Sequence, residues 1–143
     1  MSLIVLDASV AVKWFLHGKG ETLADEAFAL LDRYVKDEVR FLVPDLFWVE
    51  FANVMWKAVR LGRFPKALAD AALATLTQYD FPTFPTVNLL SKAFEIATTY
   101  DRTVYDSIYV ALAVQSKAQL VTADERLANS LAAHFPVKWL GAI

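Results

Sequence analysis

The sequence predicts an α/β protein built on a parallel sheet. Short apolar runs of the kind that form buried strands lie at residues 2–6, 41–43, 120–121 and 137–140. Longer segments with helical periodicity separate them, and strands that alternate with helices are typical of parallel α/β folds. The 143-residue chain has no repeat and no linker-like tract. We therefore expect a single domain over residues 1–143.

Helices are expected between these strands. Ser9 is placed to cap the first helix, which we expect to run to about His17, and a loop follows at residues 18–20. The prolines of the segment 81–87 favour an extended backbone there. The expected helices span residues 9–17, 22–36, 45–61, 65–79, 89–100, 105–117 and 124–134.

Composition excludes several classes of protein. The chain is 57% hydrophobic with a mean hydropathy of +0.37, yet no apolar run reaches the ~18 residues that a membrane span needs. The surplus of apolar residues predicts a buried interface, such as that of a homodimer. The absence of cysteine excludes disulfides and thiolate metal sites. With no signal-like start, we expect a cytoplasmic protein, and the net charge of −2 argues against broad electrostatic binding of nucleic acid.

Asp7 follows the first strand directly, without the Gly, Pro or Asn that usually marks a turn. The carboxyl ends of parallel strands are where α/β proteins bind ligands. The alternative is a turn aspartate that accepts hydrogen bonds from the first amides of the next helix. Ser9 is better placed for that task, so we favour a site role for Asp7.

Glu50 lies in an otherwise apolar helix. With Asn53, Lys57 and Arg60 it forms one narrow polar stripe at helical spacing. A solvent-facing stripe and a site role are equally supported by this pattern.

Two further aspartates lie near expected helix starts. Thr103 and Asp106 resemble a capping box, so on its own Asp106 is best explained as part of a helix cap. Asp124 follows the strand 120–121. There Thr122 with Glu125 fits a capping box better than Asp124 does, which leaves Asp124 free for a site.

Several of these acids would meet at one edge of the sheet. Two unit charges 4 Å apart repel by roughly 4 kcal/mol at an effective dielectric of 20, so such a cluster needs a cation or bound protons. Oxygen ligands are in excess and the only histidines are His17 and His134, which favours Mg²⁺ or Mn²⁺. A hard cation of this kind suits attack on a phosphodiester.

These motifs together resemble the PIN domain. The strand-terminal Leu6-Asp7-Ala8-Ser9, Glu50 within a helix, the run VYDSIYVALA that contains Asp106, and LVTAD ending on Asp124 occur in that family's order and spacing. The likeness covers essentially the whole chain and is greatest to the short VapC-like toxins of toxin–antitoxin pairs. It implies a three-layer α/β/α sandwich with a central parallel sheet.

The resemblance also implies a function, a site and partners. The function is that of an Mg²⁺- or Mn²⁺-dependent endoribonuclease acting on single-stranded RNA. Its metal-binding and catalytic acids carry over onto Asp7, Glu50, Asp106 and Asp124, and its supporting hydroxyl residues onto Ser9 and Thr122. The implied partner is a small VapB-like antitoxin, while the surplus of apolar residues suggests a second copy of the chain.

Other interpretations stay open at this point. Arg126 stands where some relatives have an additional acid, which leaves the number of metal ions open. Residues that qualify for contact with the RNA backbone also fit ordinary surface charges or salt bridges; they are Lys13, Lys57, Arg60, Arg102 and Arg126. A PIN-domain nuclease of RNA processing without an antitoxin, or a non-catalytic PIN-fold binding module, are the alternative functions.

Overall fold

A five-stranded parallel sheet forms the centre of the computed structural model, which describes residues 1–16, 18 and 21–143. The strand order is β3-β2-β1-β4-β5, and every neighbouring pair is parallel. The strands are β1 (Ser2–Leu6), β2 (Val39–Pro44), β3 (Thr83–Phe84), β4 (Gln119–Thr122) and β5 (Val137–Trp139).

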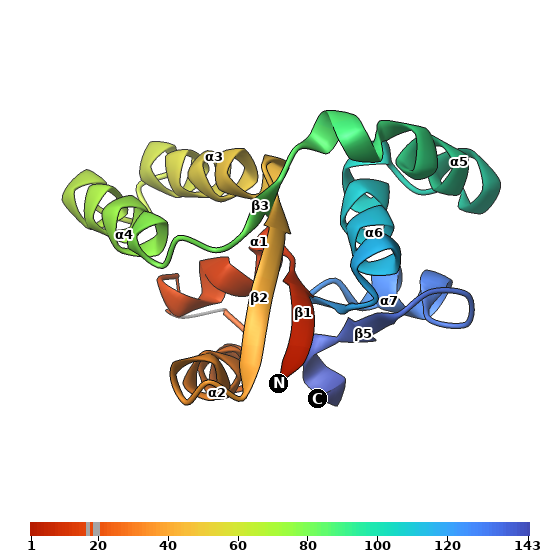
Figure 1. The fold of residues 1–143 in the computed structure, drawn as a ribbon. Helices are drawn as coiled ribbons and strands as arrows, with labels where there is room; N and C mark the ends of the chain where they lie inside the picture. The colour runs from red at the N-terminus through yellow and green to blue at the C-terminus, as the bar shows by residue number, and fades with distance from the viewer. Residues whose placement is uncertain (17, 19–20) are drawn as a thin grey trace.

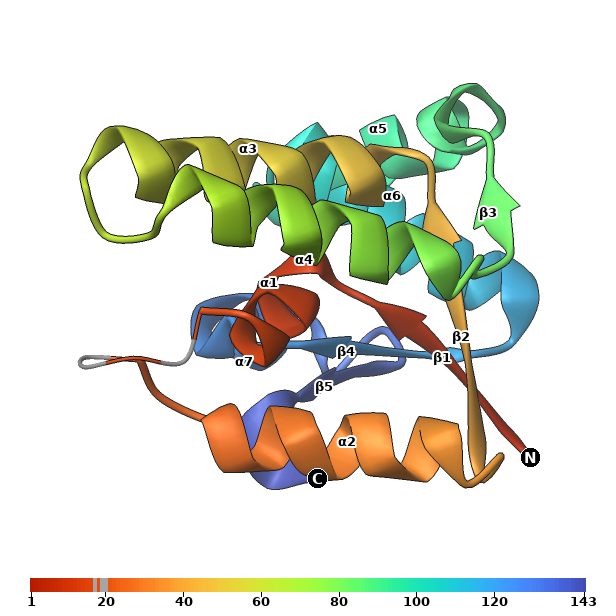
Figure 2. The same ribbon diagram turned by 90° about the vertical axis from the view of Figure 1, so that its left-hand side faces the viewer.

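Helices cover both faces of this sheet. Figure 1 shows α2, α3 and α4 on one side of β1 and β2, with α5 and α6 on the other. Seen from the former side, α3 and α4 lie next to each other while α2 lies at the far end of the same layer (Figure 2). The helical elements are α1 (Ala8–Ala11), η1 (Val12–Trp14), α2 (Ala24–Val35), α3 (Leu46–Arg60), α4 (Lys66–Gln78), η2 (Thr86–Leu89), α5 (Leu90–Tyr100), α6 (Val104–Ser116), α7 (Glu125–Leu131) and η3 (Leu140–Ala142).

Helix α6 is buried against the centre of the sheet, where it contacts β1, β2 and β4. Every residue from Ser107 to Ala113 is buried. A helix that is apolar on all sides is expected to pack in this way. In its first turn Asp106 is half-buried, whereas Tyr105 is exposed.

The three-layer α/β architecture predicted from the sequence is confirmed. The first helix is shorter than expected, because α1 passes into the 3₁₀ turn η1 and ends at Trp14. Its predicted end at His17, and residues 19 and 20 of the predicted loop, lie outside the described residues. In the segment 81–87 only Thr83–Phe84 pairs as a strand, and the 3₁₀ turn η2 follows.

Aromatic residues of the first and third helical segments mostly fill the core. Trp14, Phe47 and Phe51 are buried, and Trp14 Nε1 donates a 2.9 Å hydrogen bond to the Ala27 carbonyl. By contrast, the side chain of Trp56 is 57% exposed on α3. Among the described residues, the helices are too short or too polar to cross a membrane.

Candidate functional site

The edge of the sheet at which β1 and β4 end brings two aspartates together. From β1 the chain continues to β2 on one side, whereas β4 lies on the other side of β1, so the connections diverge at this point. Such a switch point, at the carboxyl ends of the strands, is where open α/β sheets bind ligands. Asp7 follows β1 and Asp124 lies two residues beyond β4. The Asp7 amide donates a 3.2 Å hydrogen bond to the Val121 carbonyl, which fixes the two ends side by side.

The carboxylate of Asp7 is held from two directions. Thr122 Oγ1 donates a 2.7 Å hydrogen bond to Asp7 Oδ2, and the Ser9 amide donates a 3.4 Å bond to Oδ1. Asp7 is thus the N-cap of α1, and the prediction that Ser9 caps this helix is wrong. Ser9 Oγ instead accepts a 3.1 Å hydrogen bond from the Ala123 amide, which ties α1 to the segment after β4.

Asp124 caps the next helix. Its Oδ1 accepts a 3.2 Å hydrogen bond from the Leu127 amide at the start of α7, so the prediction that Asp124 is free of capping is wrong. The Thr122 hydroxyl, expected in that role, accepts from the Asp124 amide at 3.1 Å while it donates to Asp7. One buried hydroxyl therefore links both strand-terminal aspartates. An aspartate can cap a helix through one oxygen and keep the other for a site.

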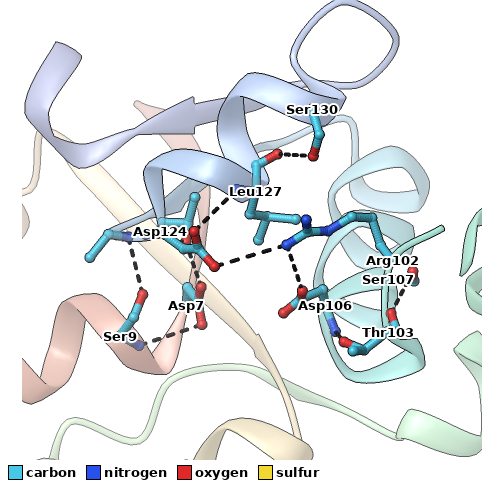
Figure 3. A network of polar contacts seen from close by, with 11 residues as sticks. Asp7, Ser9, Arg102, Thr103, Asp106, Ser107, Asp124, Leu127 and Ser130 are labelled. Atoms are coloured by element: carbon cyan, nitrogen blue, oxygen red, sulfur yellow. Dashed lines mark hydrogen bonds and ion pairs between the residues drawn. The ribbon is translucent and has the colours of Figure 1, made fainter. Parts of the chain in front are cut away.

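Asp106 lies in the first turn of α6, where the helix dipole favours negative charge. Thr103 Oγ1 accepts a 3.1 Å hydrogen bond from the Asp106 amide, so the predicted cap at Thr103 is present. Arg102 Nη2 donates a 3.1 Å hydrogen bond to Asp106 Oδ2 and lies 4.0 Å from Asp124 Oδ2. Figure 3 shows this guanidinium pointing between the two carboxylates, with Asp7 close by.

Glu50 projects from α3 toward α6. Tyr109 Oη donates a 2.6 Å hydrogen bond to Glu50 Oε1. Glu50 is half-buried, whereas Asn53, Lys57 and Arg60 of the same polar stripe are exposed. The stripe is therefore split between the site and solvent.

Tyr109 is the residue of the candidate site that the sequence analysis missed. The side chain is 2% exposed and belongs to the apolar run that packs α6 on the sheet. The available signal was a single phenol hydroxyl three residues after Asp106, on a helix that otherwise buries apolar groups. Burial of a hydroxyl requires a hydrogen-bond partner, and here that partner is Glu50.

The acids influence one another electrostatically. Burial raises the pKa of Asp7 and the charge of Asp106 adds to this rise, while the hydrogen bonds from Thr122 and Ser9 oppose it. Burial also raises the pKa of Glu50, with smaller contributions from Asp7 and Asp106 and an opposing one from the Tyr109 hydrogen bond. The pKa of Tyr109 is raised by burial and by the carboxylates of Asp7 and Glu50, so its phenol stays a neutral donor.

The donor set fits a hard divalent cation in its chemistry. Carboxylate and hydroxyl oxygens surround the end of the sheet, which matches the preference of Mg²⁺ and Mn²⁺. Within the described residues, no group of three or more His, Asp or Glu side chains is already spaced to hold a metal ion. A cation would therefore draw these carboxylates closer together than they lie here.

The residues expected to contact RNA differ in their burial and in whether they contact the acids. Lys13 is buried, and its ammonium lies 2.9 Å from Glu21 Oε1. Lys57 and Arg60 are exposed on α3, with the Arg60 guanidinium 5.2 Å from the centre of the Trp56 ring. Arg126 is exposed on α7. We call Asp7, Glu50, Asp106 and Asp124 the acidic cluster. Of the five cations, Arg102 is the one that contacts it, at Asp106 and Asp124.

Comparisons with known proteins agree with this fold. The sequence model of the PIN domain matches residues 4–130. The chain is 30% identical over 135 residues to a protein named Ribonuclease VapC9 from Mycobacterium tuberculosis, covering 94% of this chain and 96% of that one.

Solved structures show the same fold. A crystal structure from Pyrobaculum aerophilum has a TM-score of 0.72 at 22% identity, with 99% of this chain and 85% of that one covered. A toxin–antitoxin complex from Klebsiella pneumoniae has a TM-score of 0.60 at 18% identity, with 96% of each chain covered.

Proposed function

The chain belongs to the PIN domain family, and from this premise we propose that it is a ribonuclease that cleaves single-stranded RNA as the toxin of a toxin–antitoxin pair. The observation that carries the proposal is the convergence of Asp7, Asp106 and Asp124 at the switch point of the sheet, with Glu50 beside them on α3. The ribonuclease name of the Mycobacterium tuberculosis relative, which aligns over nearly the full length of both chains, supports the same reaction.

In this proposal Asp7, Asp106 and Asp124 hold Mg²⁺ or Mn²⁺ and Glu50 completes the cluster. When bound, such a cation lowers the pKa of water and stabilises negative charge on phosphoryl oxygens. Support comes from the all-oxygen donor set. The raised pKa values of Asp7 and Glu50 agree with it, since burial raises both and the neighbouring acids add to the rise.

The side chains around the acids have separate tasks. Thr122 and Ser9 hold the Asp7 carboxylate in one orientation. Tyr109 fixes Oε1 of Glu50, which leaves Oε2 to accept the proton of the attacking water. The elevated pKa of Glu50 suits a general base, since a carboxylate of ordinary pKa holds a proton poorly near neutral pH.

Contacts with RNA phosphates are assigned to cations near the cluster and on α3. Arg102 lies against Asp106 and Asp124, Arg126 is exposed on α7, and Lys57 and Arg60 are exposed on α3. The net charge of −2 argues against broad electrostatic attraction of nucleic acid from a distance. These contacts therefore position a bound strand and do not draw it in.

We also propose an antitoxin and a second copy of the chain as partners. A groove between η1 and α3 is lined mainly by apolar side chains, and a partner helix would lay its apolar face into it; its lining includes Val12, Phe15, Leu16, Val54, Leu61 and Phe64. The Klebsiella pneumoniae neighbour is a complex of this kind. Val49 and Trp56, exposed one heptad apart on α3, supply an apolar patch for self-association.

Cleavage assays on single-stranded RNA with added Mn²⁺ test the proposal. We expect Asp7→Asn to abolish cleavage. Asp45→Asn is the matched control, since Asp45 also follows a strand but binds Thr86 away from the cluster. An Asp7→Asn protein that cleaves at the wild-type rate contradicts the proposed enzyme. A wild-type protein that binds its antitoxin but cleaves none of the RNAs supports the binding-module alternative.

A further inference from the structure

Arg102 is placed within the acidic cluster and not on the open surface. Its side chain is 22% exposed and extends from the turn between α5 and α6, where Asp101 adopts a left-handed backbone with φ of 55°. The Arg102 amide is fixed by a 3.2 Å hydrogen bond to the Ala97 carbonyl. The turn therefore holds Arg102 at the start of α6, next to Asp106.

The contact with the acids is made by one nitrogen. Arg102 Nη2 lies 3.1 Å from Asp106 Oδ2 and 4.0 Å from Asp124 Oδ2, and the buried Nε has no hydrogen-bond partner among the described residues. Arginine and carboxylate pair most strongly when two nitrogens meet two oxygens. Here a single nitrogen serves two carboxylates from different helices, so the guanidinium holds this place through its charge and not through a complete hydrogen-bonding fork.

We propose that Arg102 is a built-in competitor of the metal ion, which occupies the space between Asp106 and Asp124 until a divalent cation displaces it. The inference rests on the proposed function, because it concerns the metal of that same site. The oxygens that face Nη2 are the Oδ2 atoms of Asp106 and Asp124, which the proposed site also needs. A guanidinium stays charged at all physiological pH values, so it cannot leave by losing its proton. A divalent ion and a guanidinium at the same oxygens repel each other, and binding of one requires withdrawal of the other.

This competition sets the metal concentration at which the site fills. Without Arg102, the metal ion would bind Asp106 and Asp124 without having to displace another cation. With Arg102 in place, its positive charge reduces the repulsion between these two carboxylates in the metal-free protein. The role that we propose for Arg102 at RNA phosphates then begins once the metal has freed the guanidinium.

Calorimetric titration with Mn²⁺ tests the competition directly. For Arg102→Gln we expect binding about tenfold tighter than for wild type. This is the order of effect of removing a partly screened charge that lies 3.1 and 4.0 Å from the two Oδ2 atoms. Arg102→Lys keeps the charge and is expected to bind Mn²⁺ with nearly wild-type affinity. Arg126→Gln, an equal charge change two residues from Asp124 on an exposed side chain, is expected to leave the affinity unchanged within about twofold.

Thermal unfolding gives a second readout, because the effect of Arg102→Gln on the melting temperature should differ between metal-free and metal-bound protein. In EDTA we expect Arg102→Gln to melt below wild type, because Asp106 and Asp124 lose their counter-charge. In saturating Mn²⁺ the difference should close or reverse, since tighter binding stabilises the folded state further. A purely structural arginine would lower the melting temperature equally in both conditions, and that result overturns the proposal.

A measurement on the wild-type chain avoids dependence on variants that fold poorly. The ¹⁵N NMR signal of the Arg102 Nε–H group should shift on addition of Mg²⁺ with the same concentration dependence as binding. An unchanged signal at saturation overturns the competition. Equal Mn²⁺ affinities for wild type and Arg102→Gln also overturn it and leave the proposed nuclease intact, whereas no Mn²⁺ binding by either protein overturns the metal site as well.

Discussion

Tyr109 Oη donates a 2.6 Å hydrogen bond to Glu50 Oε1, which joins α6 to α3 across 59 residues of sequence. The bond stabilises the charged form of Glu50 against a burial that raises its pKa. It also satisfies the hydroxyl of a side chain that is 2% exposed. The interaction thus connects the packing of α6 to the protonation of a site carboxylate.

Tyr109→Phe removes this bond with little change of shape. We expect the pKa of Glu50 to rise further, so the acidic limb of the pH profile of RNA cleavage should move to higher pH. Stability should fall by about 1–3 kcal/mol, because the half-buried carboxylate loses its donor. The pH–rate profile and urea unfolding check both effects. Tyr34→Phe is the control, since Tyr34 stacks on Phe41 away from the acids; the same pH shift in that variant would contradict the assignment.

Thr122→Val tests the hydroxyl that links Asp7 to Asp124. The variant loses the donor to Asp7 Oδ2 and the acceptor for the Asp124 amide. We expect a loss of about 2 kcal/mol in unfolding free energy, because hydrogen bonds to charged groups contribute more than neutral ones. Mn²⁺ affinity should also fall, as calorimetry would measure. Thr122→Ser keeps the hydroxyl and should restore both quantities; failure of that rescue would show that the methyl group matters instead.

Metal-free stability should depend on pH in a defined direction. The pKa values of Asp7 and Glu50 are raised above 3.8 and 4.5, so the folded state holds protons that the unfolded state has already released. Stability in EDTA should therefore fall as pH rises from these values through the folded-state pKa values. Urea unfolding at a series of pH values measures the fall, and saturating Mn²⁺ should reduce it.

Asp7→Asn is the matched variant for this pH dependence. It removes one of the buried charges, so its metal-free stability should decline less with pH than that of wild type. We expect it to equal or exceed the wild-type unfolding free energy at neutral pH in EDTA while losing Mn²⁺ binding. A lower stability than wild type at neutral pH would contradict the electrostatic cost assigned to Asp7.

Trp56→Glu tests self-association. Trp56 is 57% exposed on α3 and Val49, one heptad earlier, is 67% exposed. A charge placed in an apolar interface should lower the mass measured by light scattering from that of a dimer to that of a monomer. The melting temperature of the monomer should change little, because Trp56 lies outside the core. A variant such as Lys66→Glu, at an exposed position of α4, is expected to keep the wild-type mass.

Local sequence signals predicted the positions of the acids at the strand ends better than they predicted the contacts of these acids. Asp7 and Asp124 were recognisable because each closely follows an apolar run, and periodicity placed Glu50 on a helix. The capping roles of Ser9 and Asp124 were predicted wrongly, since the choice between neighbouring oxygens depends on which side chains the adjacent strand end presents.

Contacts between distant segments were beyond the sequence patterns. The ion pair of Arg102 with Asp124 and the bond of Tyr109 with Glu50 depend on the strand order and on how α6 is seated on the sheet. Neither follows from spacing along the chain. Lys13 shows the same limit, because a lysine expected among surface charges is buried against Glu21.

The hydrogen bond from Thr122 to Asp7 also has a consequence for protein synthesis, since its two residues are 115 positions apart. At about 5–20 residues added per second, Asp7 leaves the ribosome's catalytic centre roughly 6–23 seconds before Thr122 is incorporated. During that interval β1 has no β4 beside it, and Asp124 does not yet exist. A chain released before residue 122 has been added therefore lacks both the Thr122 bond to Asp7 and the carboxylate of Asp124.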